Sequence, residues 1–126
     1  MILNFTKKKI KSKYIIIFAD LLLLTQNPTK FKNTLSEIEN LVKILILNNN
    51  TIILPSYNLN FPSTKKTSND IKYITSGYLI KFLLKKFSFK RTNKPMYNYG
   101  VIGPNSKKIL KLKQSTAWGN DSVINF

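Results

Sequence analysis

The sequence contains neither cysteine nor histidine, and these two absences limit the chemistry that it can perform. Without cysteine there is no disulfide, no thiol nucleophile and no thiolate ligand for a metal. Without histidine, a metal site would depend on carboxylates, and the five acidic residues are scattered along the chain. We therefore expect no metal centre and no imidazole that acts as a general base.

Acidic residues are few beside the 21 basic ones, so the formal charge is +16, and Arg91 is the only arginine. Lysine is a hydrated point charge, whereas proteins that read nucleic acids commonly use the planar arginine fork. We interpret the charge mainly as a solvated surface, because AT-rich coding DNA favours the Asn, Ile and Lys that abound here. Attraction of an anionic ligand such as a nucleotide cofactor stays open, and nucleic acid is the least favoured partner.

Long hydrophobic runs are also missing from the chain. The longest, Tyr14 to Leu24, is interrupted by Asp20 and is too short to cross a bilayer. Lys7 to Lys9 precede it as in a signal peptide, but no small-residue cleavage site follows. We expect a cytoplasmic protein without a membrane partner, folded as one domain over residues 1–126.

The first half of the chain has the pattern of a strand, a helix and a second strand. The β-branched and aromatic run Tyr14 to Phe18 predicts a buried, central strand. Helical spacing follows from Thr34, which with Glu37 forms a capping-box pattern, and the asparagines at 48–50 end the helix. Thr51 to Leu54 predicts a second buried strand. A βαβ unit of this kind implies that the two strands are parallel.

The second half predicts a long polar loop at 58–70, a helix from about Thr75 to Phe87, and a strand over Tyr97 to Ile102. Gly77, near the start of the helix, would permit a close approach of the backbone to a neighbour. The segment 107–113 is too short to assign. The whole pattern predicts an α/β fold, a mixed sheet with flanking helices.

Several motifs then follow one another in a fixed order. They are Pro55-Ser56-Tyr57, Arg91-Thr92 with Pro95 and Gly103, and finally Trp118-Gly119 with Asp121-Ser122. With this order, the chain resembles the aminoglycoside 3-N-acetyltransferase family of antibiotic N-acetyltransferases over about residues 12 to 126.

The resemblance implies the N-terminal half of that family's fold. It implies transfer of an acetyl group from acetyl-CoA, as co-substrate, to an amino group of an aminoglycoside or aminosugar. It also implies that the cofactor groove is contacted by residues at the family's motif positions, namely Ser56, Tyr57, Arg91, Thr92, Asn98 and Tyr99.

The chain also departs from the family pattern. Phe18-Ala19 stands where the family has His-Ser, and Ile74, Lys94 and Asn98 replace a Ser, a frequent His and a Ser. The sequence stops near the family's midpoint, before the segment that carries the histidine base. We therefore expect a truncated, incomplete domain with no catalytic residue and little activity alone, from either a degraded or a split gene. In a split enzyme, a second polypeptide that carries the missing half would restore the activity.

Other interpretations stay open. Asp20 and Asp121 are the only carboxylates near the motifs, and either could act as a base if desolvated. A different class of function is a non-catalytic basic module that binds an anionic ligand or nucleic acid. A third interpretation is a fragment that exposes an apolar edge and face of its sheet, which favours dimerisation.

Overall fold

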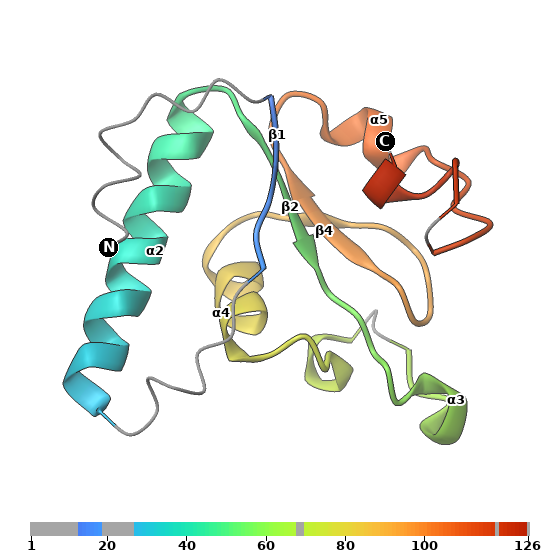
Figure 1. Ribbon diagram of the computed structural model, residues 1–126, viewed down its shortest axis with the longest axis horizontal. Coiled ribbons are helices and arrows are strands. Elements are labelled where there is room, and N and C mark those ends of the chain that lie inside the picture. The colour runs from blue at the N-terminus through green and yellow to red at the C-terminus, as the bar shows by residue number, and fades with distance from the viewer. Residues whose placement is uncertain (1–12, 19–26, 68–69, 118, 126) are drawn as a thin grey trace.

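The computed structural model describes residues 13–18, 27–67, 70–117 and 119–125. They form an α/β fold, in which helices flank a mixed sheet of four strands (Figure 1). The strands are β1 (Tyr14–Ile16), β2 (Thr51–Pro55), β3 (Lys90–Arg91) and β4 (Tyr99–Ile102). The helices are α2 (Pro28–Leu47), α3 (Phe61–Thr64), α4 (Tyr78–Lys86) and α5 (Ser106–Leu110), with short 3₁₀ turns at Ile71–Tyr73 and Val123–Asn125.

The strand order is β1-β2-β4-β3. β1 runs parallel to β2, which confirms the predicted βαβ unit, while β4 is antiparallel to both β2 and β3. The prediction of a central strand at Tyr14 to Phe18 was wrong, because β1 lies at the edge of the sheet and its residues are only partly buried. The central strands are β2, which is buried along its whole length, and β4.

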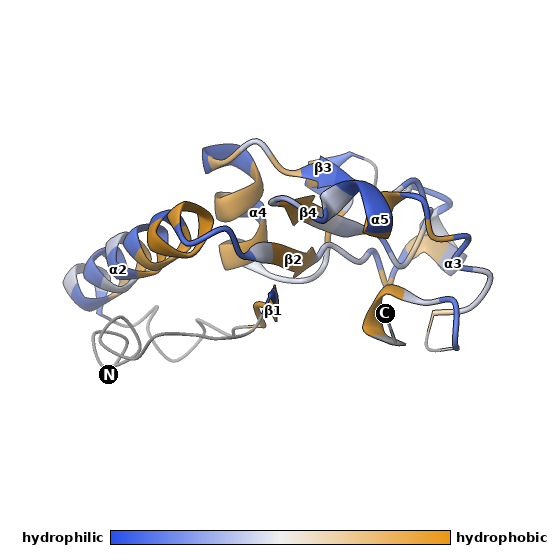
Figure 2. Ribbon diagram, turned by 90° about the horizontal axis from the view of Figure 1, so that it is seen from above, coloured by the Kyte–Doolittle hydropathy of each residue, from blue (hydrophilic) through white to orange (hydrophobic). Residues whose placement is uncertain are grey.

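Side chains that alternate along β2 divide the core between the two faces of the sheet. Ile52 and Leu54 pack with the buried faces of α2 and α4, whereas Ile53 packs with Tyr99 and Ile109 from β4 and α5. Figure 2 shows the same arrangement, with α2 and α4 on one side of the sheet and α5 on the other. The buried apolar side chains thus form two clusters, and the cluster beneath α2 and α4 is the larger.

Helix α2 begins earlier than the sequence predicts. Its N-cap is Asn27, whose Oδ1 accepts a hydrogen bond from Lys30 N at 3.0 Å, and Pro28 occupies the first turn. The capping box predicted at Thr34 was wrong, because a stronger cap seven residues upstream places Thr34 inside the helix. The predicted end was right: Asn48 is the C-cap, and Asn49 takes a left-handed φ of 59°.

Two glycines serve different purposes from those expected. Gly77 is the N-cap of α4 and has φ 97°, but a Cβ there would meet nothing within 4 Å, so the predicted close approach was wrong. The close approach occurs at Gly103 (φ 122°), where a Cβ would lie 2.7 Å from Thr51 Cα. A non-glycine residue is therefore excluded at Gly103 by both conformation and space.

The described residues of the polar segment 58–70 make contacts with one another. It contains α3, and the buried Asn58 donates from Nδ2 to the carbonyl oxygen of Lys66 and accepts from Asn60 N at 3.0 Å. This side chain therefore folds the start of the loop back on itself. No helix in the described part of the chain is long and apolar enough to cross a membrane.

Candidate functional site

The chain continues past the end of β2 with strand-like pairing to the segment before β4. Ser56 N donates to Asn98 O and Asn58 N donates to Met96 O, both at 2.8 Å. Because side chains alternate along an extended chain, Ser56 and Tyr57 point to opposite faces of the sheet. Tyr57 accordingly packs with the α5-side cluster.

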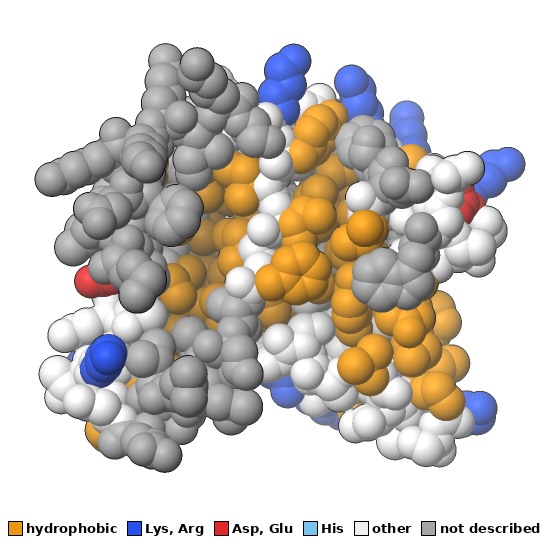
Figure 3. Space-filling model, in the orientation of Figure 1, with side chains coloured by type: hydrophobic (Ala, Val, Ile, Leu, Met, Phe, Trp, Pro, Cys, Tyr) orange, Lys and Arg blue, Asp and Glu red, His pale blue; other side chains and the backbone are white. Residues whose placement is uncertain are grey.

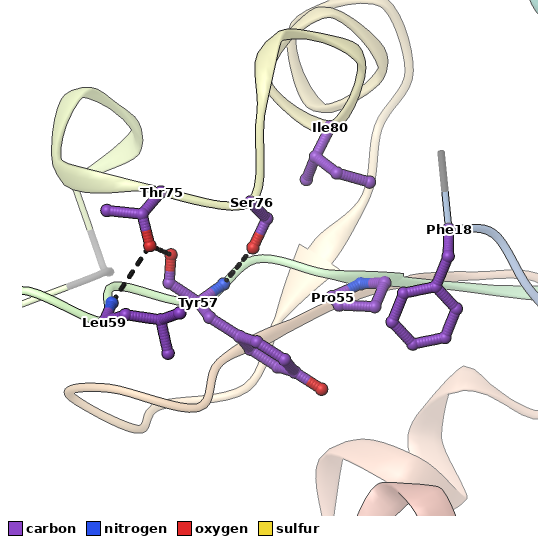
Figure 4. Close-up of a pocket in the computed structure, with 7 residues that line it drawn as sticks. All are labelled: Phe18, Pro55, Tyr57, Leu59, Thr75, Ser76 and Ile80. Atoms are coloured by element: carbon purple, nitrogen blue, oxygen red, sulfur yellow. Dashed lines mark hydrogen bonds between the residues drawn. The ribbon is translucent and has the colours of Figure 1, made fainter. Parts of the chain in front are cut away.

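A pocket of about 460 Å³ opens beside Tyr57. Its lining is mostly apolar and comes from the end of β1, the end of β2, the segment before α4 and α4 itself (Figure 4). Two of the lining side chains are largely exposed, Phe18 at 64% and Leu59 at 54%. The described residues that line it are Phe18, Pro55, Tyr57, Leu59, Thr75, Ser76 and Ile80.

Backbone hydrogen bonds fix the polar wall of this pocket. Tyr57 N donates to Ser76 Oγ at 2.8 Å, and Thr75 N donates to Tyr57 O at 2.7 Å. Leu59 N donates to Thr75 Oγ1 at 3.0 Å, so both hydroxyl groups clamp the segment after β2 (Figure 4). The pocket thus has a preformed wall in which oxygen atoms of Thr75 and Ser76 lie among apolar groups.

Three tyrosines form a cluster on the Tyr57 side. The Tyr57 hydroxyl donates a hydrogen bond to the Tyr99 hydroxyl at 2.6 Å. The Tyr57 ring packs edge to face against two others, with its centroid 5.3 Å from that of Tyr99 and 5.2 Å from that of Tyr97. Burial raises the pKa of Tyr57, and the hydrogen bond to Tyr99 raises it further. Burial likewise raises the pKa of Tyr99. Both phenols are therefore neutral hydrogen-bonding groups at physiological pH and do not act as bases.

Arg91 lies on β3 with Nη2 3.5 Å from Ser56 Oγ. Burial lowers the pKa of the Arg91 guanidinium, and the nearby Asp70 carboxylate opposes that effect. An arginine side chain stays protonated after such a shift. Arg91 therefore supplies a positive charge beside Ser56, whose side chain points to the opposite face of the sheet from Tyr57.

Thr92 and Asn98 close the turn between β3 and β4. Thr92 Oγ1 donates to Asn98 Oδ1 at 2.9 Å and accepts from Tyr99 N at 2.9 Å. Thr92 is 5% exposed, and Ser56 and Asn98 are fully buried. These three predicted cofactor residues thus hold the backbone that carries Tyr57, Arg91 and Tyr99.

Of the two carboxylates that the sequence offered as bases, Asp20 lies outside the described residues, as does Trp118. Asp121 Oδ2 accepts hydrogen bonds from both Ser115 N and Ser115 Oγ, and Oδ1 accepts one from Thr116 Oγ1. The bonds from Ser115, followed by that from Thr116, lower the pKa of Asp121 to about 2. Asp121 is therefore a weak base that closes the loop at 115–121.

Of the predicted site residues, Tyr57 lines this pocket, Tyr99 contacts it only through Tyr57, and Arg91 lies beside Ser56 outside the lining. The pocket also includes residues that the motifs did not identify. Ile80 and Leu59 are among them. Thr75 and Ser76 are also among them, and the only sequence signal for these two was their position just before the predicted helix start. Within the described ranges, no three His, Cys, Asp or Glu side chains are grouped so that they could hold a metal ion.

Comparison with known proteins returned no family model, curated protein or solved structure that matches this chain. The features that bear on function are the pocket and its hydrogen bonds, the positive charge of the chain and the motif order of the sequence.

Proposed function

We propose that this chain binds acetyl-CoA and forms the cofactor-binding part of an N-acetyltransferase that acts on an amino group of an aminoglycoside or aminosugar. The observation that carries the proposal is the pocket at the end of β2, where the motif residue Tyr57 lies. The resemblance to the N-terminal half of aminoglycoside 3-N-acetyltransferases supplies the identity of the ligand.

The pocket has the character that an acyl-pantetheine arm requires. Its volume of about 460 Å³ lies within the range of about 300–1,000 Å³ that is usual for small-molecule sites. Its walls are mostly apolar, and Thr75 and Ser76 add a few fixed oxygen atoms for the amide groups of the arm. The neutral Tyr57 hydroxyl donates its proton to Tyr99, so it can accept a hydrogen bond from an amide N–H of the arm.

Charge supports the same ligand. CoA carries phosphate groups, and a net charge of +16 raises the local concentration of such an anion. Arg91 is the only arginine in the sequence, so it alone can pair with a phosphate in a bidentate manner. It contacts Ser56, which lies between the pocket residues Pro55 and Tyr57 in the chain, and this makes it the favoured anchor.

The described site has no side chain suited to act as a general base that takes a proton from the acceptor amine. Acetyl transfer requires the attacking amine to lose a proton, and a general base contributes roughly 10²–10⁴-fold to such a step. The sequence has no histidine, and neither Tyr57 nor Asp121 is a suitable base near neutral pH. We therefore propose that binding exceeds turnover in this chain, and that a second polypeptide supplies the base.

Isothermal titration calorimetry with acetyl-CoA tests this proposal. We expect saturable binding, and a loss of about tenfold or more in affinity for Arg91→Ala, because a charge-assisted hydrogen bond is removed. Lys90→Ala is the matched control: it removes the same charge from the exposed neighbour on β3 and should change the affinity far less. Equal losses of affinity in both variants would mean that Arg91 contributes only its charge and makes no specific contact with the phosphate.

A free-thiol assay tests the second part of the proposal. With acetyl-CoA and an aminoglycoside acceptor, the purified chain should release CoA thiol at a rate close to the uncatalysed one. Robust turnover by the chain alone would contradict the assignment of the base to a second polypeptide.

Non-catalytic binding of an anionic aromatic ligand is the second candidate, and one surface favours it. A groove of about 300 Å³ on α4 is lined by Tyr78, Lys81, Phe82, Lys85 and Lys86. The exposed Tyr78 ring and the half-buried Phe82 ring lie beside ammonium groups, which suits bases and phosphates of single-stranded nucleic acid. Submicromolar, salt-dependent binding of an oligonucleotide that Lys81→Ala weakens would support this candidate over acetyl-CoA binding.

A further inference from the structure

A second, smaller pocket lies behind the tyrosine cluster. It has a volume of about 160 Å³ and lies between the turn that leads into β4 and the loop that follows α5. Tyr97 and Tyr99 line it, and the Tyr57 ring that packs against both faces the first pocket. The other lining residues are Lys94, Pro95, Met96, Gln114, Ser115, Thr116 and Ala117.

Gln114 gives this pocket an unmet hydrogen-bonding requirement. The side chain is 9% exposed, and its buried Nε2 has no hydrogen-bond acceptor among the residues that the structure describes. A buried donor without a partner costs about 1–3 kcal/mol, so native proteins rarely retain one without a reason. An acceptor atom in the pocket would remove that cost.

The backbone of Gln114 is a second, independent sign. Its φ is 48°, a left-handed conformation that costs a non-glycine residue of order 1–3 kcal/mol. Strain of this kind collects at ligand-binding positions, because the surrounding structure holds the residue where function requires it. Here the strained residue is also the one whose amide lacks an acceptor.

The surroundings select an anionic acceptor. The Lys94 ammonium group borders the pocket and donates to Lys113 O at 2.7 Å, so a positive charge is held at its rim. Asp121 in the same loop is also ionised, but its oxygen atoms accept hydrogen bonds from Ser115 and Thr116, so it is not the acceptor for Gln114. An ionised acceptor makes a stronger hydrogen bond to an amide than a neutral one.

The size of the pocket limits the ligand. A water molecule occupies about 30 Å³ of the liquid, so about 160 Å³ holds a few waters or one small organic ion. We propose that this second pocket binds a small carboxylate of the size of acetate, with Gln114 Nε2 as donor to the carboxylate oxygen and Lys94 as the nearby cation. The site does not depend on acetyl-CoA binding in the first pocket.

NMR titration with sodium acetate provides a local test. The sequence has only two glutamines, Gln26 and Gln114, so the Gln114 side-chain amide can be assigned in ¹⁵N-labelled protein by comparison with Gln114→Met. At constant ionic strength, the Gln114 Nε2 signals should shift saturably with acetate, with a millimolar dissociation constant. Gln114→Glu, which keeps the shape but replaces the donor, should weaken acetate binding about tenfold or more as read from the backbone amides of residues 94–99.

The other outcomes overturn the proposal. A linear response without saturation means that water occupies the pocket. An equal shift with sodium chloride identifies a non-selective anion site, and a saturable shift with acetamide but not with acetate identifies a neutral ligand. Unchanged acetate affinity in a folded Gln114→Glu variant would remove Gln114 from the site.

Discussion

Gly103 illustrates how one residue can be required by its neighbours. It follows β4 directly, and its φ of 122° lies where side chains are rarely tolerated. A Cβ would also press against the backbone at Asn50 and Thr51, which cannot yield as a flexible side chain would. The turn after β4 can therefore lie against the start of β2 only because this residue is glycine.

Gly103→Ala should lower the free energy of unfolding by about 3 kcal/mol or more, because strain and a backbone clash add. Gly77→Ala is the matched control, since it has a positive φ but open space around its Cβ. It should cost about 1–2 kcal/mol from strain alone. Urea unfolding of both variants measures the difference, and equal losses would contradict the close approach at Gly103.

The hydroxyl pair of Tyr57 and Tyr99 makes stability depend on pH. Because burial raises the pKa of both phenols, the folded chain keeps protons that the unfolded chain releases above about pH 10. The contribution is thus fully present below the ordinary tyrosine pKa and is lost as the pH rises beyond it.

Urea unfolding between about pH 9 and pH 11 should therefore show falling stability, and Tyr57→Phe should reduce the slope by up to about 1.4 kcal/mol per pH unit. Tyr78→Phe is the control, because Tyr78 is 57% exposed. A slope that both variants change equally would contradict the buried pair.

At the scale of single residues, the sequence could identify Tyr57, Arg91 and Tyr99 only through their motif positions. It could not show that Ser56, Thr92 and Asn98 are buried supports, because burial depends on how strands far apart in the chain pair. Gln114 carries no sequence signal: its strain and its unpaired amide exist only in the folded loop.

Among the elements, α2 shows what local patterns can and cannot specify. The helix itself was predictable from its apolar spacing, and its buried residues Leu35, Ile38, Val42 and Leu45 follow that spacing. The start of the helix was not predictable, because both Asn27 and Thr34 are suitable N-caps. The structure shows that Asn27 is the residue used.

Asn27→Ala should destabilise the protein by about 1 kcal/mol, because the amide of Lys30 loses its acceptor. Thr34→Ala should be neutral or stabilise by up to about 0.5 kcal/mol, because alanine has the higher helix propensity. Circular dichroism during urea unfolding measures both. The reverse order of effects would place the start of the helix at Thr34.

The position of β1 was also beyond local patterns. Its apolar composition resembles that of a central strand, but which strands pair with it is decided by the whole chain. The strand β3 was not predicted, since its two residues form a strand only through their pairing with β4. Short edge elements depend on tertiary contacts more than on propensity.

Across the whole molecule, some apolar side chains stay exposed and most positive charges have no acidic partner. Figure 3 shows hydrophobic side chains gathered across the middle of one face, with lysines at its rim. Ile16 and Phe18, at the end of β1, are 36% and 64% exposed. Only two ion pairs, Lys43–Glu39 and Lys72–Asp70, are formed in the described ranges.

This imbalance predicts a response to salt. Like charges destabilise a compact state, and the screening length falls from about 30 Å at 0.01 M salt to about 8 Å at 0.15 M. The thermal unfolding midpoint should therefore rise by several degrees between these concentrations of NaCl. Glycerol, which leaves ionic strength unchanged, is the control, and a midpoint that falls with salt would contradict net self-repulsion.

The pocket beside Tyr57 is the basis of the whole account, and calorimetry of acetyl-CoA binding to pocket variants tests it most directly. Wild type should bind with a dissociation constant between about 1 μM and 1 mM. Leu59→Trp, at an exposed position in the pocket wall, should weaken binding about tenfold or more by narrowing the pocket, while Leu47→Trp, at an exposed position on α2, should leave it unchanged. No saturable binding to folded wild type, or equal affinities in all three proteins, would contradict the account.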